Sequence, residues 1–226
     1  MKKTALFILM LCMGSALTLK AQNTDVSGMD NVIYIEPFTV EPGTTEVTLQ
    51  FKMKNTAEIR GFQFSLFLPE GVTIKKASTG KITGSKLNSD RLPEYVDEEE
   101  DIEYEPHTLK MSEQNGVINY LCDQFDGLTF TGNEGVLLTS KIILPADLPV
   151  GDYEIVMKDV KLAGPDGERV TETIKEIKTT MTIGTATAIK SVSTKKVVNG
   201  TYNVAGQQVE MQKGINIVDG KKVMVK

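Results

Sequence analysis

The sequence predicts an all-β sandwich, because apolar and polar residues alternate in successive segments that are separated by turn signals. The clearest alternation runs from Glu46 to Leu68. Its apolar positions are Val47, Leu49, Phe51 and Met53, followed by Phe62, Phe64, Leu66 and Leu68. A period of two is typical of a strand with one buried face and one solvated face. We therefore expect two strands that face one shared core, joined by the polar connection Asn55–Gly61.

Further strands are predicted on both sides of this pair. Val32–Ile35 precedes it, and Val72–Lys75 follows it after a Pro-Glu-Gly turn. The later predicted strands are His107–Met111, Val117–Cys122, Gly135–Leu144, Tyr153–Met157, Val160–Ala163, Arg169–Thr173 and Ile177–Ile183. The first two of these later strands are expected to form a hairpin, because Asn-Gly lies between them. Short strands at this spacing favour a sandwich.

The segment Ser78–Pro106 interrupts the pattern and is predicted to be mostly a long loop or insertion. It ends in the acidic block Asp97–Glu105. A block of like charges repels itself and resists burial. Carboxylates are also calcium ligands, but the block lacks the alternating Asp spacing of a calcium-binding loop. A solvated loop without calcium is the favoured interpretation.

The first 21 residues are predicted to be a cleaved secretory signal peptide. They combine a basic start, an apolar run and Ala21 before a polar break, which is the pattern of an export leader. The apolar run is too short for a comfortable membrane span. Cys12 raises lipid anchoring as an alternative, but the bulky Met10 and Leu11 before it favour cleavage after Ala21.

Composition restricts the partners of the mature chain. Cleavage removes 21 of the 226 residues and leaves a chain of 205. Lys2, Lys3 and Lys20 are removed with the leader, so 22 of the 25 basic residues remain. With 30 acidic residues, the net charge of the mature chain is −8. A moderately acidic exported protein is poorly suited to nucleic acid or anionic lipid. Only Cys122 remains after cleavage, so no intramolecular disulfide is predicted.

From Asn31 to Ile183 the chain resembles cohesin domains. The segments that carry the resemblance are Val40–Leu49, Gly61–Val72, Gly116–Tyr120, Phe130–Leu138 and Leu148–Tyr153. They follow the order and spacing of strands and turns in that family. The resemblance implies a jelly-roll sandwich over residues 22–183, a fold shared with some cellulose-binding domains. Cohesins bind dockerins and the related domains hold polysaccharide, so it also implies a non-enzymatic binding module.

The C-terminal part is predicted to be a separate β tail, residues 191–226, after a small, polar linker at residues 184–190. Its expected strands are Thr201–Val204, Gln207–Glu210, Gly214–Val218 and Lys221–Val225. The Asp-Gly pair between the last two is a two-residue hairpin signal. Tyr202–Val209 and Lys213–Val223 resemble the C-terminal sorting segment of exported Bacteroidetes proteins. That resemblance implies type IX secretion, or a relic of it, and delivery to the cell surface.

No catalytic or metal motif stands out, so we predict no enzyme activity and no cofactor. His107 is the only histidine, no Gly-x-Ser-x-Gly elbow is present, and no second histidine completes a metal cluster. His107 is therefore expected to be structural. Cys122 lacks an identifiable activating group, so a small buried residue is the expectation for it as well.

Aromatic side chains are the remaining candidates for ligand contact, because sugars often bind rings that have one solvated face. The chain has no tryptophan. The available rings are Tyr34, Tyr95, Tyr104, Tyr120 and Phe67. The candidate ligand-binding residues are Phe67, which alternates outward, Tyr95 and Tyr104. The predicted function is polysaccharide binding at or outside the cell surface. The alternative is adhesion to, or assembly with, an envelope or extracellular protein.

Overall fold

The computed structural model describes residues 22–97, 102–185, 201–202, 214–218 and 221–225. The chain divides into two compact units, Met1–Ala186 and Thr187–Lys226. The predicted signal peptide, the centre of the acidic block and most of the predicted linker lie outside the described residues. No helix within the described ranges is long and apolar enough to cross a membrane.

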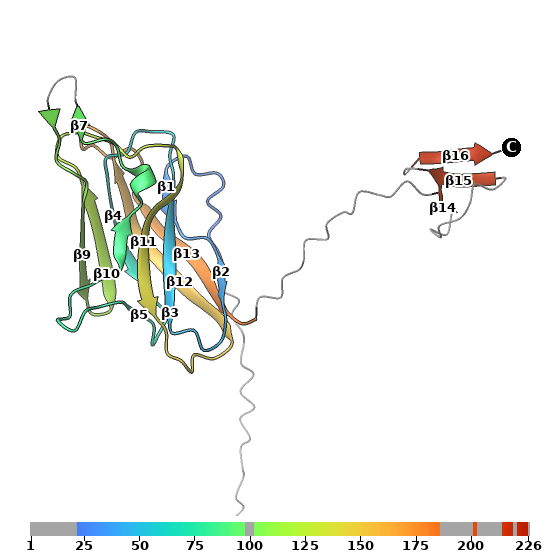
Figure 1. Ribbon diagram of the computed structural model, residues 1–226, viewed down its shortest axis with the longest axis horizontal. Coiled ribbons are helices and arrows are strands. Elements are labelled where there is room, and N and C mark those ends of the chain that lie inside the picture. Colours follow the sequence, from blue (N-terminus) through green and yellow to red (C-terminus); the bar gives the residue numbers. More distant parts are fainter. Residues whose placement is uncertain (1–21, 98–101, 186–200, 203–213, 219–220, 226) are drawn as a thin grey trace, which may run out of the picture. The chain divides into compact units, whose positions relative to one another are not determined.

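The larger unit is a sandwich of two β-sheets (Figure 1). The first sheet has the order β1-β3-β11-β5, and β6 also pairs with β11. Its strands are β1 (Val32–Tyr34), β3 (Glu46–Lys54), β5 (Thr73–Ile74), β6 (Ser85–Leu87) and β11 (Glu134–Ile143). All of these pairings are antiparallel. Strand β3 therefore lies between β1 and β11 at the centre of this layer.

The second sheet has six strands in the order β2-β13-β12-β4-β10-β9. They are β2 (Phe38–Val40), β4 (Gly61–Phe67), β9 (Thr108–Gln114), β10 (Val117–Asp123), β12 (Gly151–Ala163) and β13 (Ile174–Ile183). The β2–β13 pair is parallel and the other pairs are antiparallel. The two layers confirm the predicted all-β jelly-roll sandwich.

The core is built by the alternation in β3 and β4, which lie in opposite sheets. Phe51 and Phe64 are 0% and 1% exposed, and their ring centroids are 5.3 Å apart. Tyr120 of β10 stacks 4.6 Å from Phe64, and its hydroxyl donates a 3.0 Å hydrogen bond to Ser140 Oγ of β11. Burying each such ring is worth about 1.5–3 kcal/mol. The predicted inward direction of both phenylalanines is confirmed, so their polar neighbours form the outer faces.

Strand β12 is longer than the sequence predicts. The segments Tyr153–Met157 and Val160–Ala163, predicted as separate strands, belong to one continuous strand. Asp159 between them has a φ of 52°, and the register with β4 shifts at this point. A bulge adds one residue to a strand and breaks its alternation. That extra residue explains why one strand has the sequence pattern of two.

The structure adds short elements to the predicted loop Ser78–Pro106 and corrects the prediction for Arg169–Thr173. Ser78–Pro106 contains β6, the 3-10 turn η1 (Ser89–Arg91) and the short pair β7 (Val96–Asp97) and β8 (Ile102–Glu103). Strand β6 pairs with the distant β11, and β7 pairs with the nearby β8, so a sequence poor in apolar alternation still forms short strands. Arg169–Thr173 is not a strand, because only Arg169 forms a bridge, to Ala163. Its side chains are exposed or half-buried, and only Val170 packs against the core.

The smaller unit contains a three-stranded antiparallel sheet. Its strands are β14 (Thr201–Tyr202), β15 (Gly214–Val218) and β16 (Lys221–Val225). The register pairs Gly214 with Val225 and Val218 with Lys221, so the predicted hairpin is present. Its two turn residues and the predicted strand Gln207–Glu210 lie outside the described residues.

Candidate binding face

The outer side of the second sheet presents an open surface across β9, β10, β4 and β12. Strand register places the outward side chains in three rows across the strands. The rows are Lys110–Leu121–Gln63–Lys161, Ser112–Asn119–Ser65–Lys158 and Gln114–Val117–Phe67–Val156. All of these residues are exposed or half-buried. They form the four-strand face.

The size of this face suits a macromolecular contact. Strands β4, β9 and β10 have seven residues each. At about 3.4 Å per residue and about 4.8 Å per strand, the face measures roughly 24 Å by 19 Å. That area, roughly 450 Å², matches weak or transient protein interfaces, which bury below roughly 600 Å² per partner.

One row of the four-strand face is apolar in three of its four positions. Val117, Phe67 and Val156 are paired neighbours on β10, β4 and β12, and each is half-buried. The Lys158 ammonium lies 5.0 Å from the centroid of the Phe67 ring, within cation–π range. The predicted outward direction of Phe67 agrees with this position, and its role in ligand binding stays a prediction.

The adjoining row is polar and partly paired within itself. The Ser65 hydroxyl donates a 2.8 Å hydrogen bond to the Asn119 side-chain oxygen. Lys158 Nζ lies 3.5 Å from a Glu176 carboxylate oxygen on β13. An apolar strip beside hydrogen-bonding groups is common in protein interfaces, whose centres have few charged residues, and Lys158 is the charged residue of this row.

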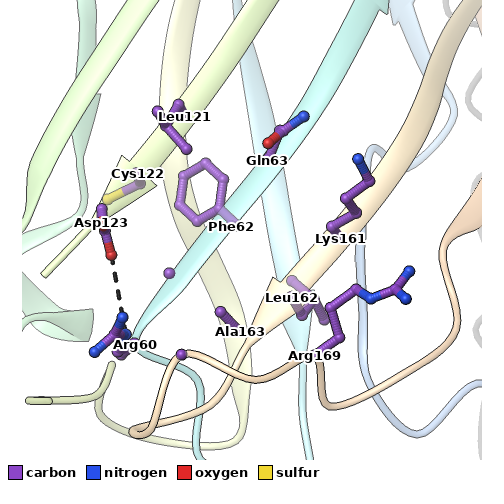
Figure 2. Close-up of a pocket in the computed structure, with 12 residues that line it drawn as sticks. Arg60, Phe62, Gln63, Leu121, Cys122, Asp123, Lys161, Leu162, Ala163 and Arg169 are labelled. Carbon is purple, nitrogen blue, oxygen red and sulfur yellow. Dashed lines mark ion pairs between the residues drawn. The ribbon is translucent and has the colours of Figure 1, made fainter.

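A pocket of about 250 Å³ opens at the end of the face where the Leu121–Gln63 row lies (Figure 2). Leu121 lines it and is 43% exposed. Gly61 and Ala163 also line it, with little side-chain volume. A Cβ atom at Gly61 would lie 2.7 Å from the carbonyl oxygen of Cys122. Glycine is therefore needed here, because β4 and β10 approach too closely for any larger residue.

The pocket carries more positive than negative side chains. Arg60, Lys161 and Arg169 line it together with the single acid Asp123. Figure 2 shows Arg60 and Asp123 on one side, and Lys161 and Arg169 on the other. Arg60 Nε lies 3.9 Å from Asp123 Oδ1, which is an ion pair but too long for a hydrogen bond. The excess is notable because the whole chain has a formal net charge of −5.

The Arg60 guanidinium keeps unused donors. Nη1 donates a 3.1 Å hydrogen bond to the carbonyl oxygen of Pro165. Nε is buried and has no hydrogen-bond partner among the residues the structure describes. Within the same residues, Lys161 and Arg169 form no ion pair; Arg169 donates one hydrogen bond, of 3.0 Å, to the Thr173 hydroxyl. Because Nε has no exposed surface, a ligand in the pocket can reach only the rest of the Arg60 side chain, which is 20% exposed.

The structure does not bring the three predicted ligand-binding aromatics together. Tyr95 and Tyr104 belong to the segment around β7 and β8, and neither lies in the rows of the four-strand face or lines the pocket. The Tyr95 hydroxyl lies 2.8 Å from His107 Nδ1 and accepts a 3.2 Å hydrogen bond from the His107 amide. The Tyr104 amide donates a 2.7 Å hydrogen bond to the Tyr95 carbonyl. The hydroxyl of Tyr95 therefore forms its hydrogen bonds within the protein, to His107.

Two further aromatic candidates also lie elsewhere. Tyr120 is 0% exposed in the core, so its candidacy for ligand contact is wrong; burial raises the pKa of its hydroxyl. Side chains of β10 alternate between the two faces of the sheet, and Tyr120 is at a position whose side chain points into the core. Tyr34 is half-buried on β1, in the other sheet, where it pairs with Lys52.

The two side chains with potential nucleophilic or basic chemistry are buried. His107 is 8% exposed, its ring centroid lies 4.2 Å from that of Phe130, and burial lowers its pKa to about 4. Cys122 is 1% exposed. Burial, assisted by the Asp123 charge, raises the pKa of its thiol to about 12. A reactive cysteine needs a lowered pKa and access to substrate, and Cys122 has neither.

The described residues contain no group of three or more His, Cys, Asp or Glu side chains that could hold a metal ion. Residues 98–101 of the acidic block lie outside them. The interpretation of that block as a solvated loop without calcium therefore stays a prediction.

Sequence reasoning missed the cationic pocket because its residues are far apart in the chain. Arg60 precedes β4, Lys161 follows the bulge in β12, and Arg169 lies in the loop after that strand. No local spacing signals their proximity. The one available hint was Gly61 at a strand start, since glycine in a strand often marks close backbone approach.

Comparison with known proteins yields no family assignment. No protein-family model matches the sequence, and no curated protein matches it. Among solved structures, a non-cellulosomal cohesin from the archaeon Archaeoglobus fulgidus has 13% identity and a TM-score of 0.48, covering 68% of this chain and 91% of that chain.

Two other solved structures are similar at the same level. A type I cohesin–dockerin complex from Clostridium thermocellum has 16% identity and a TM-score of 0.49, covering 68% of this chain and 99% of that chain. A cohesin module from a Clostridium perfringens family 33 glycoside hydrolase has 11% identity and a TM-score of 0.46, covering 69% and 96%. Likeness this distant transfers neither a partner nor an activity to this chain.

Proposed function

We propose that the sandwich is an exported, non-enzymatic module that binds a protein partner through the four-strand face. The observation that carries the proposal is the apolar row Val117–Phe67–Val156 lying beside the polar row of Asn119 and Ser65 on an open sheet. A flat surface with an apolar strip and neutral polar neighbours complements another protein surface of the same kind. Its dimensions fit a weak or transient contact.

A protein partner accounts for this face better than a polysaccharide. Sugar rings stack on aromatic faces that are open to solvent. The ring of Phe67 has the Lys158 ammonium 5.0 Å from its centroid, the chain has no tryptophan, and Tyr95 is bonded to His107. Polysaccharide binding is the competing assignment. The outward side chain of Phe67 and the polar row beside it are the observations that favour it.

Export and surface delivery are part of the proposal and rest on sequence. The leader ending at Ala21 supports export, and the segments Tyr202–Val209 and Lys213–Val223 resemble sorting signals.

Site-specific photo-crosslinking in the producing cell tests the proposal. A photoreactive residue is placed singly at Gln63 or Asn119, both exposed on the four-strand face. The matched control position is Gln50, which is exposed on β3 of the opposite sheet. We expect discrete protein adducts from Gln63 and Asn119, identified by mass spectrometry, and none of these adducts from Gln50.

Two outcomes contradict the proposal. One is the absence of protein adducts from both face positions, and the other is the same adducts from Gln50. A glycan array then decides the competing assignment. A glycan that binds the wild-type chain and is lost in Phe67→Ala, with no protein adducts, establishes polysaccharide binding instead.

A further inference from the structure

We propose that the cationic pocket at the end of the four-strand face is an anchor for a carboxylate side chain of the protein partner. This inference rests on the proposed function, because it assigns a specific subsite to the same face. The pocket is lined by Arg60, Lys161 and Arg169 and by one acid, Asp123. The occupant is the aspartate or glutamate side chain of an acidic segment.

The charge of the pocket selects for an anion. Three cationic groups face one carboxylate, and the mature chain as a whole is acidic. A local positive site on a negative protein does not arise from composition and attracts an opposite charge selectively. Because Lys161 and Arg169 form no ion pair within the described residues, both remain available to a ligand.

The donors of the pocket fit a carboxylate in particular. Arg60 donates one Nη1 hydrogen bond to the Pro165 carbonyl, and its Nη2 has no hydrogen-bond partner within the described part of the chain. Guanidinium groups match the planar geometry of carboxylates and hydrogen-bond them in pairs. A volume of about 250 Å³ holds one acidic side chain with a few waters, since each water occupies about 30 Å³.

The surroundings of the pocket favour a peptide rather than a free inorganic ion. Leu121 lines the pocket and is 43% exposed, and its row neighbour Gln63 lines it too. An apolar side chain and an amide beside the cations can contact the backbone and neighbouring side chains of a peptide. An inorganic ion would use neither contact.

Titration of the isotope-labelled mature chain with a capped tetraglutamate peptide, followed by NMR, tests the anchor. We expect amide shifts concentrated at residues 60–63, 121–123 and 161–163, with no shifts from a capped tetraglutamine peptide. Sodium sulfate at equal ionic strength is the third probe. Shifts from sulfate as large as those from tetraglutamate would overturn the assignment to a carboxylate side chain.

Variants with opposite expected effects separate recognition from damage to the fold. Lys161→Gln with Arg169→Gln should weaken peptide binding about threefold to tenfold, since two charge contacts at the protein surface are lost. Asp123→Asn should strengthen it about twofold, because a like charge leaves the pocket. The matched control is Lys81→Gln with Lys86→Gln, two exposed lysines outside the pocket, which should leave binding unchanged.

The failure of this inference is distinguishable from failure of the proposed function. Protein adducts from Gln63 and Asn119 without any tetraglutamate binding refute the anchor and leave the protein-binding face intact. Equal weakening by the Lys81/Lys86 control also refutes the anchor, because it shows an effect of net charge alone. Peptide binding without protein adducts refutes the proposed face and, with it, the assignment of the pocket to that partner.

Discussion

His107 illustrates how one buried residue makes stability depend on pH. The Tyr95 hydroxyl accepts from the His107 amide at 3.2 Å and lies 2.8 Å from Nδ1, so it donates to Nδ1 of the neutral ring. The proton is then on Nε2, where an interaction with the Arg60 backbone and the charge of Asp123 oppose, but do not outweigh, the effect of burial. Burial lowers the pKa of His107 to about 4, against about 6.5 in an unfolded chain.

We expect the sandwich to lose stability as the pH falls from 6.5 to 4. Between these pH values His107 is protonated in the unfolded chain and neutral in the folded protein. A fall in pH therefore favours unfolding. The loss reaches about 3 kcal/mol below pH 4, from roughly 1.4 kcal/mol for each unit of pKa difference. Urea unfolding at several pH values measures it, with His107→Asn as the control that removes this titration. A pH dependence identical in the two proteins between pH 6.5 and 4 would contradict the assignment.

The burial of Arg91 is a property that neither alternation nor motif spacing in the sequence predicts. It is 4% exposed, and burial lowers its pKa. Its guanidinium donates to the carbonyl oxygens of Thr131, Met53 (3.3 Å) and Gly132 (3.1 Å) and to Asn55 Oδ1 (3.0 Å). Nothing in the polar sequence around it predicts a buried cation, because its acceptors, three backbone carbonyls and one side-chain amide, come from distant segments.

At the level of elements, the β9–β10 hairpin depends on backbone geometry at its turn. Asn115 and Gly116 have φ values of 53° and 78°, and the strands pair from Val117–Gln114 onward. Two positive φ angles in a two-residue turn suit the right-handed twist of the flanking strands. The turn therefore positions β9, which supplies one edge of the four-strand face.

We expect Gly116→Ala to destabilise the sandwich by about 1 kcal/mol, because a left-handed backbone costs a non-glycine residue about 1–2 kcal/mol. A Cβ at Gly116 would meet no atom within 4 Å, so the cost is conformational and not steric. Gly28→Ala is the control, since Gly28 has equal space and no positive φ. Urea unfolding of both variants measures the difference, and equal stability of the two would refute the argument.

Alternation predicted the elements wherever it ran unbroken over a half-buried strand. Phe51 and Phe64 were placed correctly because a period of two fixes which side each residue faces. The prediction failed where one extra residue reversed the face to which the following side chains point, as at Asp159 in β12. It also failed for β6, whose three residues Ser85–Leu87 pair with β11 but are too few to show a period.

The candidate site was only partly predictable at the level of the whole molecule. Phe67 was identified because its outward parity is visible within one strand. The pocket residues Arg60, Lys161 and Arg169 come together only through the pairing of β4 with β12 and the bridge after it. Pairing between strands almost a hundred residues apart is set by the whole core, so no local pattern contains it.

The ends of the chain support a final prediction about the whole molecule. We expect the exported protein to begin at Gln22, because cleavage after Ala21 fits the leader pattern, and mass spectrometry of its N-terminus measures this. Removal of residues 191–226 should prevent delivery to the outer surface while export from the cytoplasm continues. The sorting-like segments are then lost, but the leader and the sandwich strands, which end at Ile183, are retained.

Protease treatment of intact cells measures this delivery. The full-length chain should be digested, and the truncated chain should remain protected until the outer membrane is opened. Gly28→Ala in the full-length chain is the control for a substitution without effect on sorting. Equal digestion of truncated and full-length chains would show that the C-terminal sheet of β14, β15 and β16 has another role. A mature protein that begins at Cys12 would instead support lipid anchoring through that cysteine, and one that keeps the whole leader would support anchoring within the membrane.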